Sequence, residues 1–290
     1  GMNGPVSVVG VGNMGGAIAA NLLARGLSVQ VCDLVPRKVR SLEEKGAVAL
    51  ANAAQGAIKS VATVVCVVDD VQTEAVLFGP VGVANTAPAG HAVLLCPTLA
   101  PQAVEDFAQR LAARGIQALD APMSGGPARA LDGTMSLMVA CDDAVFAQHR
   151  WLLEALSGKL FRIGGRPGDG ARTKLVNNLL AGINLVGAAE ALALAARLGL
   201  DAAHTLDVIE QSSGQSWIGS DRLRRAIAGD YAPRAHVTLL GKDTRLAMDA
   251  ARAAGFEGPL GAAARDTFAR AVAAGLGDRD DAALYRLLSE

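Results

Sequence analysis

The feature that most constrains the fold is a group of three glycines between an apolar segment and an alanine-rich segment near the start of the chain. The stretch VSVVGVGNMGGAIAANLLARG covers residues 6–26 and places Gly10, Gly12 and Gly15 in the pattern G-x-G-x-x-G. After a strand and at the start of a helix, this pattern gives a tight turn, a close backbone approach and close helix–strand packing, in that order, with the helix N-terminus facing a pyrophosphate. A glycine-rich turn can also arise for packing alone, so the surrounding sequence has to decide.

An acidic residue stands where a dinucleotide site needs one. The next apolar segment, SVQVCD, ends in Asp33, 21 residues after Gly12. A carboxylate there accepts hydrogen bonds from the adenosine ribose hydroxyls and repels a 2′-phosphate. We therefore predict a dinucleotide cofactor, NAD in preference to NADP. The alternative for Asp33 is a helix N-cap or a solvated loop carboxylate.

Valine-rich apolar segments alternate with segments of helical period up to about residue 163. The apolar segments are VSVVGVG, SVQVCD, VATVVCVV, HAVLLC, IQALDAP and TMSLMVA, with helical segments such as residues 36–45 and 102–114 between several of them. Strands that are apolar throughout, rather than at alternate positions, indicate burial on both faces, as in a parallel sheet covered by helices. We predict a doubly wound α/β fold of the Rossmann type.

Strand signals stop after the glycine-rich segment GGRPGDG at residues 164–170. From residue 171 to about 198 apolar residues recur at helical spacing, and further helical patterns lie near 202–211, 216–228, 237–254, 259–274 and 279–288. We predict two domains: a dinucleotide-binding domain over residues 1–163, and an all-α domain over residues 164–290 built on one long helix.

Charge and cysteine content exclude several classes of function. The 290-residue chain has a formal net charge of -1 and no block of like charge, so nothing recruits a nucleic acid. Its four cysteines show no metal-ligand spacing and its four histidines are scattered, so we predict buried thiols in a reducing compartment and no metal site. No signal peptide is evident, and the longest uncharged stretch of the later chain, residues 175–189, is too short and too polar to span a bilayer. We expect a cytoplasmic protein with no membrane partner.

Three later stretches, together with the glycine motif, resemble one enzyme family. They are DAPMSGGPARALDGTM (120–135), GARTKLVNNLLAG (170–182) and GKDTRLA (241–247). In this order they resemble the β-hydroxyacid dehydrogenase family, which includes 3-hydroxyisobutyrate dehydrogenase and is related to 6-phosphogluconate dehydrogenase. The resemblance covers about residues 6–289. It implies a dehydrogenase that acts on a small hydroxy acid.

The residues of these stretches suit that chemistry. Ser124, Gly125 and Gly126 follow a predicted strand, and amides without side chains beside a hydroxyl form a concave anion site; in the family this segment binds the substrate carboxylate. Lys174 and Asn178 project from one face of the long helix. An alcohol that loses a hydride must also lose its proton, and the family assigns the proton transfer to the matching lysine and the orientation of the same oxygen to the matching amide.

The resemblance extends to the cofactor and to the assembly. It implies that Lys242 lies near the nicotinamide and the substrate, and that Thr98 contacts the cofactor near its nicotinamide end, although Cys96 and Pro97 replace a commoner pair of serines. It also implies a homodimer or homotetramer formed through the helical domain. The remaining residues that it implies in the cofactor site are Asn13, Met14 and Val68.

For the substrate we predict a four-carbon sugar acid such as threonate, with 3-hydroxyisobutyrate and tartronate semialdehyde as the alternatives. The stretches TEAVLFG, AGINLVGAAEALALAARLGL and GQSWIGSDR are similar to the branch of the family that oxidises threonate, which implies a four-carbon sugar acid. Asn177 and Asn178 instead follow the pattern of the enzymes for 3-hydroxyisobutyrate and tartronate semialdehyde. Trp217 could line the substrate pocket or belong to the core. Two further alternatives, an imine reductase and a non-catalytic NAD-binding relative, are disfavoured because their members typically lack the lysine found here at Lys174.

Overall fold

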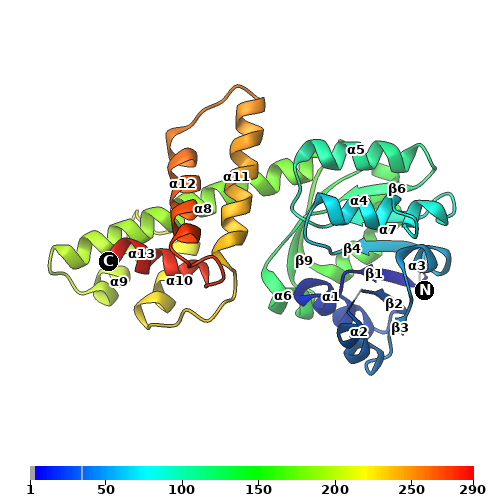
Figure 1. Ribbon diagram of the computed structural model, residues 1–290, viewed down its shortest axis with the longest axis horizontal. Coiled ribbons are helices and arrows are strands. Elements are labelled where there is room, and N and C mark those ends of the chain that lie inside the picture. Colours follow the sequence, from blue (N-terminus) through cyan, green and yellow to red (C-terminus); the bar gives the residue numbers. More distant parts are fainter. Residues whose placement is uncertain (1–3, 34) are drawn as a thin grey trace. The chain divides into compact units, whose positions relative to one another are not determined.

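A computed structural model describes residues 4–33 and 35–290 of the chain (Figure 1). The chain divides into two compact units, Gly1–Lys174 and Leu175–Glu290. The first unit holds the sheet and the second is helical.

The first unit is built on one sheet, which has nine strands within the described residues. Its order is β3-β2-β1-β4-β5-β6-β8-β7, with β9 paired to β8. From β3 to β6 the neighbouring strands are parallel, whereas β8 runs antiparallel to β6 and β7. The strands are β1 (Val6–Val9), β2 (Val29–Cys32), β3 (Val48–Ala49), β4 (Ala62–Val65), β5 (Ala92–Leu95), β6 (Gln117–Asp120), β7 (Met123–Ser124), β8 (Met135–Ala140) and β9 (Ser157–Gly164).

Helices cover both faces of this sheet, because successive strand residues point to opposite sides and both sides are apolar. In β1, for example, Val6 and Val8 join one core cluster and Val9 joins the other. Figure 1 shows α1 and α6 on one side and α4 and α5 on the other. The helices that cover the first face are α1 (Asn13–Ala24), α2 (Pro36–Glu43), α6 (Gly126–Asp132) and α7 (Asp143–Leu156). The helices that cover the second face are α3 (Ala53–Lys59), α4 (Asp70–Phe78) and α5 (Pro101–Ala112). A short 3-10 turn, η1 (Val83–Asn85), follows α4.

All six apolar segments predicted as strands form strands of this sheet, and the predicted fold class is confirmed. The sequence did not predict the other three strands of the sheet. β3 and β7 have two residues each, too few for a periodic signal, and β9 contains Gly158 and several exposed side chains. These strands lie at or near the edges of the sheet, where burial no longer requires continuous apolar sequence.

The long helix α8 (Asp169–Arg197) belongs to both units and begins two residues earlier than predicted. Its 29 residues span about 43 Å at about 1.5 Å per residue. By length and composition it could cross a membrane, and only 28% of its apolar window is buried. The prediction from residues 175–189 alone therefore underestimated the apolar length of this segment, because the helix extends well beyond its uncharged part.

The second unit packs its helices around one apolar cluster that includes Leu185, Leu206, Leu240 and Phe268. The five predicted helical patterns after α8 all correspond to helical segments, although the last is split between a 3-10 turn and a short helix. The elements are α9 (Ala202–Glu210), α10 (Trp217–Ile227), α11 (Val237–Ala253), α12 (Pro259–Ala273), η2 (Asp281–Ala283) and α13 (Leu284–Ser289).

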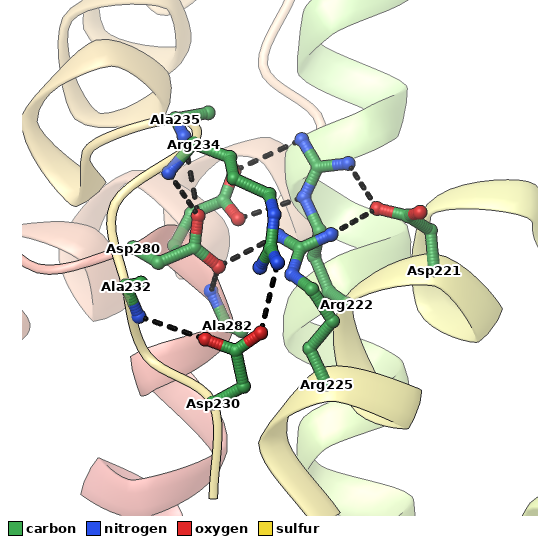
Figure 2. Close-up of polar contacts among 10 residues, drawn as sticks. Asp221, Arg222, Arg225, Asp230, Ala232, Arg234, Ala235, Asp280 and Ala282 are labelled. Atoms are coloured by element: carbon green, nitrogen blue, oxygen red, sulfur yellow. Dashed lines mark hydrogen bonds and ion pairs between the residues drawn. The ribbon is translucent and has the colours of Figure 1, made fainter. Parts of the chain in front are cut away.

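A network of arginines and aspartates joins α10 to η2 in this unit (Figure 2). Asp280 and Asp281 are fully buried, and each is paired with an arginine: Arg225 donates to Asp280 at 2.7 Å and Arg222 donates to Asp281 at 2.7 Å. Both arginines also bond Asp221. Two buried carboxylates are thus neutralised by two guanidinium groups, as burial of charge requires.

Asp280 also fixes the chain that leads into α11. Its carboxylate oxygens accept hydrogen bonds from the backbone N–H groups of Arg234, Ala235 and Ala282, at 3.0, 3.1 and 3.2 Å (Figure 2). The segment before α11 is therefore tied to η2, which sets the position at which α11 starts.

Candidate active site

The glycine turn between β1 and α1 has no room for side chains at two of its three glycines. Gly10 has φ 89°, and a Cβ atom there would lie 2.9 Å from the Cys66 carbonyl group. A Cβ atom at Gly15 would lie 1.7 Å from the Gly10 oxygen, so α1 packs directly on the turn. At Gly12, by contrast, nothing lies within 4 Å of the corresponding position. The open space is on the side from which a ligand would approach the first amides of α1.

The N-terminus of α1 suits a phosphate group. Gly12 is its N-cap and has no side chain to bond the first amides, so the helix end presents N–H groups and a partial positive charge. A cavity of about 480 Å³ opens beside it, lined among others by Gly12, Asn13, Lys38 and Lys45. Asn13 is exposed and Met14 is half-buried. The donor groups and the lysines fit the pyrophosphate of a dinucleotide.

Asp33 lies at the end of β2, beside the glycine turn. Its Oδ2 accepts a hydrogen bond from the Val11 amide and its Oδ1 accepts one from the Val35 amide, both at 2.8 Å. Each carboxylate oxygen has a second lone pair, so these bonds orient the group and leave it able to accept ribose hydroxyls. The alternative of a purely solvated carboxylate is wrong, because both oxygens are bound to backbone amides.

The carboxyl ends of β1, β4, β5 and β6 lie at one edge of the sheet, because these strands are parallel. The chain reverses its direction of winding between β1 and β4, which is where α/β sheets bind their ligands. Val68 follows β4 and is 66% exposed, and its amide donates to Gln72 Oε1 at 3.0 Å. Thr98 follows β5 and is half-buried. Both predicted cofactor residues thus lie in loops on the same edge as Gly10.

The predicted carboxylate-binding segment connects β7 to α6. Ser124 is half-buried at the end of β7, and Gly125 and Gly126 have φ 129° and 74°. These angles lie in the left-handed region that favours glycine, and a Cβ atom at Gly125 would meet the side chain of Arg129. The segment therefore requires glycine for its conformation, and at Gly126 nothing lies within 4 Å of the position that a Cβ atom would take.

Lys174 is 7% exposed, and its Nζ donates a hydrogen bond to the carbonyl oxygen of Met123 at 2.7 Å. Met123 directly precedes Ser124 in β7. Two residues predicted from separate motifs, Lys174 and Ser124, are therefore brought to the same place. A buried ammonium bonded to the residue before Ser124 can bind an anionic substrate and exchange a proton with it.

A buried carboxylate holds the start of α8 in position. Asp120 is 1% exposed, and its Oδ2 accepts the backbone N–H groups of Gly168, Gly170 and Ala171 at 2.7, 2.9 and 3.2 Å. Burial raises the pKa of Asp120 to about 6, against the opposite effect of these amides. Because Asp120 ends β6, it fixes the helix start relative to the sheet, and so fixes Lys174 one turn further on.

Asn178 follows Lys174 by four residues on α8. Its Nδ2 donates to Asp243 Oδ2 at 2.6 Å, and its Oδ1 accepts from Asn177 Nδ2 at 3.1 Å. Asp243 is 8% exposed on α11, next to the half-buried Lys242. A carboxylate can only accept, so this contact determines which way the Asn178 amide points.

Sequence reasoning missed two of these residues in their structural roles. Asp243 and Asp120 stood in the quoted motifs without an assigned role. An aspartate at the end of an apolar strand, 48 residues before the glycine it binds, is the one signal that could have marked Asp120. The Met123 carbonyl oxygen could not be identified from the sequence, because every residue has a backbone carbonyl group.

Other residues singled out in the sequence lie elsewhere. Trp217 is 70% exposed at the start of α10, with the Arg222 guanidinium 5.9 Å from its ring, so a core role is wrong. In the part of the chain that the structure describes, no three His, Cys, Asp or Glu side chains are grouped as metal ligands would be.

Comparison with known proteins agrees with this arrangement. Residues 5–165 match the family model described as the NAD binding domain of 6-phosphogluconate dehydrogenase. Residues 168–288 match the model described as "NAD-binding of NADP-dependent 3-hydroxyisobutyrate dehydrogenase". The matches meet near the start of α8.

Individual relatives match over nearly the whole chain. An L-threonate dehydrogenase of Cupriavidus necator is 38% identical, covering 99% of this chain and 96% of the relative. A 3-hydroxyisobutyrate dehydrogenase of Pseudomonas aeruginosa is 36% identical, with 91% and 90% covered. The crystal structure described as 3-hydroxyisobutyrate dehydrogenase from Salmonella typhimurium has a TM-score of 0.88 and 36% identity, with 98% of this chain and 100% of that chain covered.

The fold and these similarities define an oxidoreductase that acts on CH–OH groups with a nicotinamide dinucleotide. The chain belongs to the β-hydroxyacid dehydrogenase family, and the family predicted from the four motifs is confirmed. Its substrate is a small hydroxy acid.

Proposed function

We propose that this enzyme is an NAD-dependent dehydrogenase of a four-carbon sugar acid such as threonate, with Lys174 as the general acid/base. The observation that carries the catalytic part is the hydrogen bond between Lys174 Nζ and the Met123 carbonyl oxygen, at 2.7 Å. It holds the ammonium next to Ser124, where the substrate carboxylate is proposed to bind.

The roles of the residues follow from their chemistry. Ser124, Gly125 and Gly126 bind the carboxylate through a hydroxyl and backbone amides. Lys174 takes the proton of the substrate hydroxyl, and Asn178 orients the same oxygen. Lys242 is assigned to the binding of substrate and cofactor on the family resemblance. When bound, the nicotinamide cofactor supplies the hydride acceptor.

The cofactor is proposed to bind through the glycine turn and the loops at the same sheet edge. Gly10, Gly12 and Gly15 provide the turn, with Asn13 and Met14 at the start of α1. Asp33 favours the ribose of NAD over the phosphorylated ribose of NADP. Val68 and Thr98 are the remaining residues that we propose contact the cofactor.

The choice of threonate is supported by two kinds of similarity. The relative from Cupriavidus necator is named L-threonate dehydrogenase, and so is an Escherichia coli K12 relative that is 39% identical, with 98% of this chain and 94% of the relative covered. Three stretches of the sequence, at 73–79, 181–200 and 214–222, pointed to the same branch. A site built to bond several hydroxyls rejects an analogue that lacks them by up to about 10⁴- to 10⁵-fold.

An activity screen tests the proposal. Purified enzyme is assayed with threonate, erythronate, glycerate and 3-hydroxyisobutyrate, each with NAD and with NADP, by following the absorbance of the reduced cofactor. We expect the highest kcat/KM with threonate and NAD. A higher kcat/KM with 3-hydroxyisobutyrate than with threonate would show that the branch assignment is wrong.

A second candidate is 3-hydroxyisobutyrate dehydrogenase or tartronate semialdehyde reductase. It is favoured by the pair Asn177 and Asn178, one turn from Lys174, and by the similarity to the Pseudomonas aeruginosa enzyme. The same screen, extended to tartronate semialdehyde in the reductive direction, separates the two candidates. In this second case the preferred substrate has fewer hydroxyl groups.

We also propose that the enzyme is a cytoplasmic homodimer or homotetramer. Its four cysteines are all free, which suits a reducing compartment. Leu180 and Leu194 on α8 and Leu198 directly after it are each more than half exposed, and Val176 on α8 is 70% exposed. A second copy of the chain is the proposed cover for these side chains, and the mass of the enzyme in light scattering tests this.

A further inference from the structure

Two of the four cysteines stand side by side at the ligand-binding edge of the sheet. β4 and β5 are parallel, and their last paired residues are Val65 and Leu95. Cys66 and Cys96 are the residues that directly follow these two strands. Neighbouring strands lie about 4.8 Å apart, which falls within the Cα–Cα range of about 4.4–6.8 Å found in disulfides.

The side chains of Cys66 and Cys96 also point to the same face. Val64 and Leu94, two residues earlier, belong to the same core cluster as both cysteines. Val65 and Leu95 belong to the cluster on the other face. Adjacent backbone positions and a shared face are what a disulfide requires.

The two thiols differ in access. Cys66 is half-buried, whereas Cys96 is 4% exposed. The hydrogen bond with Cys66, together with burial, raises the pKa of the Cys96 thiol well above its usual value. An oxidant therefore reaches Cys66 first, and Cys96 is the thiol placed to react with the product.

The other two cysteines are buried; Cys32 ends β2 and Cys141 directly follows β8. Burial raises the pKa of Cys32 and of Cys141 to about 11. Cys32 Sγ also bonds the Asn52 carbonyl oxygen at 3.2 Å. Cys141 belongs to the same core cluster as Cys96 but follows β8, which is separated from β5 by β6. Cys141 is therefore a matched control: a buried thiol of the same core without a paired thiol on the adjacent strand.

Cys66 lies directly beneath the glycine turn. A Cβ atom at Gly15 would be 3.1 Å from Cys66 Cβ, and one at Gly10 would be 2.9 Å from the Cys66 carbonyl carbon and oxygen. The Cys66 amide also donates to the Val9 oxygen at 2.8 Å. Because the turn packs on Cys66 without spare room, a shift of Cys66 has to move the turn.

We propose that Cys66 and Cys96 form a reversible intramolecular disulfide when a hydroperoxide oxidises the enzyme, and that this disulfide weakens cofactor binding. The Cys66 thiolate attacks the peroxide oxygen, which gives a sulfenic acid and, with hydrogen peroxide, one water. The Cys96 thiol then attacks the Cys66 sulfur, the S–S bond forms and a second water leaves. The two thiols lose two electrons and two protons, and the peroxide is reduced to two waters.

The coupling to the cofactor follows from geometry and is reciprocal. An S–S bond of about 2.05 Å draws the two sulfurs well inside their contact distance, and the pull acts on Cys66 Cβ, which lies under the turn at Gly15. If oxidation weakens NAD binding by a given factor, bound NAD must disfavour oxidation by the same factor. Each tenfold change corresponds to about 30 mV in the reduction potential of the disulfide.

The experiment treats the full-length reduced enzyme with hydrogen peroxide, with and without NAD. We expect intact-protein mass spectrometry to show loss of two hydrogen atoms, and peptide mapping to join the peptides of Cys66 and Cys96. We also expect NAD to be bound at least about fivefold more weakly by the oxidised enzyme, with full recovery on addition of dithiothreitol. These measurements need no hydroxy-acid substrate, so their outcome does not depend on whether the proposed substrate is right.

Variants make the outcome decisive. Cys96→Ser is expected to stop at the sulfenic acid, with no mass loss of two hydrogens. Cys141→Ser is expected to form the disulfide as the unaltered enzyme does. A disulfide that involves Cys32 or Cys141, oxidation of Cys66 without any disulfide in the unaltered enzyme, or equal NAD affinity before and after oxidation would each overturn the proposal.

Discussion

The ammonium group of Lys174 is bonded to the carbonyl oxygen of Met123, at 2.7 Å. This contact joins the first turns of α8 to the strand β7, over 51 residues of sequence. Asp120 also holds this helix, because its carboxylate binds three amides at or next to the start of α8. The position of the proposed acid/base is therefore set by two strands and not by the helix alone.

Replacement of Lys174 tests its role. We expect Lys174→Ala to lower kcat by about 10²- to 10⁴-fold, the usual contribution of a positioned acid or base, and to leave NAD affinity nearly unchanged. Turnover and NAD binding are measured separately. Lys159→Ala, an exposed lysine on β9, is the control and should behave as the unaltered enzyme. Unaltered turnover in Lys174→Ala would remove this residue from the mechanism.

Asp243 is expected to act through Asn178. Its hydrogen bond to Asn178 Nδ2, at 2.6 Å, fixes the orientation of the amide. Hydrogen bonds to charged groups contribute about 1.5–3 kcal/mol, so we expect Asp243→Ala to lower kcat about 10- to 100-fold. Asp243→Asn keeps an acceptor oxygen and should retain more activity.

The Asp243 variants need a check on folding, because Asp243 is buried. The melting temperature of each variant is compared with that of the unaltered enzyme. A loss of stability in Asp243→Ala with kcat and KM unchanged would mean that the residue is structural only.

The sequence predicts the first unit well because its signals are local. Valine-rich strands buried on both faces need continuous apolar residues, and the glycine turn needs glycine at Gly10 and Gly15 for steric reasons that the structure makes visible. The helices of the second unit are also predicted by a local signal, which is the helical spacing of their apolar residues. The two-residue strands β3 and β7 leave no such pattern, and neither of them was predicted.

The contacts of the candidate site could be predicted only in part. The motifs identified Ser124, Lys174 and Asn178 as candidate site residues. They did not predict which groups the polar atoms of these residues bind. Asn178 meets Asp243 across 65 residues, and Lys174 meets a backbone oxygen. Contacts of this kind depend on the packing of distant elements, which no local periodicity encodes.

Asp33 is expected to decide the cofactor. A 2′-phosphate charge about 4 Å from its carboxylate would cost about 4 kcal/mol at an effective dielectric constant of 20. Arg37 and Lys38, exposed at the start of α2, reduce this cost. We expect a higher kcat/KM with NAD than with NADP, and a shift of this ratio toward NADP in Asp33→Asn. A preference for NADP in the unaltered enzyme would contradict the prediction.

His91 is expected to make the first unit sensitive to acid. It is 2% exposed; its Nδ1 is 3.2 Å from the Ser60 carbonyl oxygen and its Nε2 is 2.8 Å from Thr63 Oγ1. A carbonyl oxygen only accepts, so Nδ1 carries the proton and Nε2 accepts from the threonine hydroxyl. Burial, with a smaller contribution from His149, lowers the pKa of His91 to about 4.

The sign of the pH effect follows from this pKa. The unfolded chain binds a proton at His91 below about pH 6.5, whereas the folded chain does so only near pH 4, so stability is full above pH 6.5 and falls as the pH drops between these values. The loss reaches about 3 kcal/mol at the lower end. Asp120 acts in the opposite direction: its folded pKa of about 6 lies above the unfolded value of 3.8, so its contribution rises as the pH falls over that range.

A comparison with His91→Asn separates the two groups. Urea unfolding is measured for both proteins at several pH values between 7.5 and 4.5, and the free energy of unfolding of the variant is subtracted from that of the unaltered enzyme. The contribution of Asp120 is common to both and cancels. We expect the difference to decline as the pH falls, because the asparagine does not titrate. A difference that stays constant across this range would show that His91 takes up its proton equally in the folded and unfolded chains.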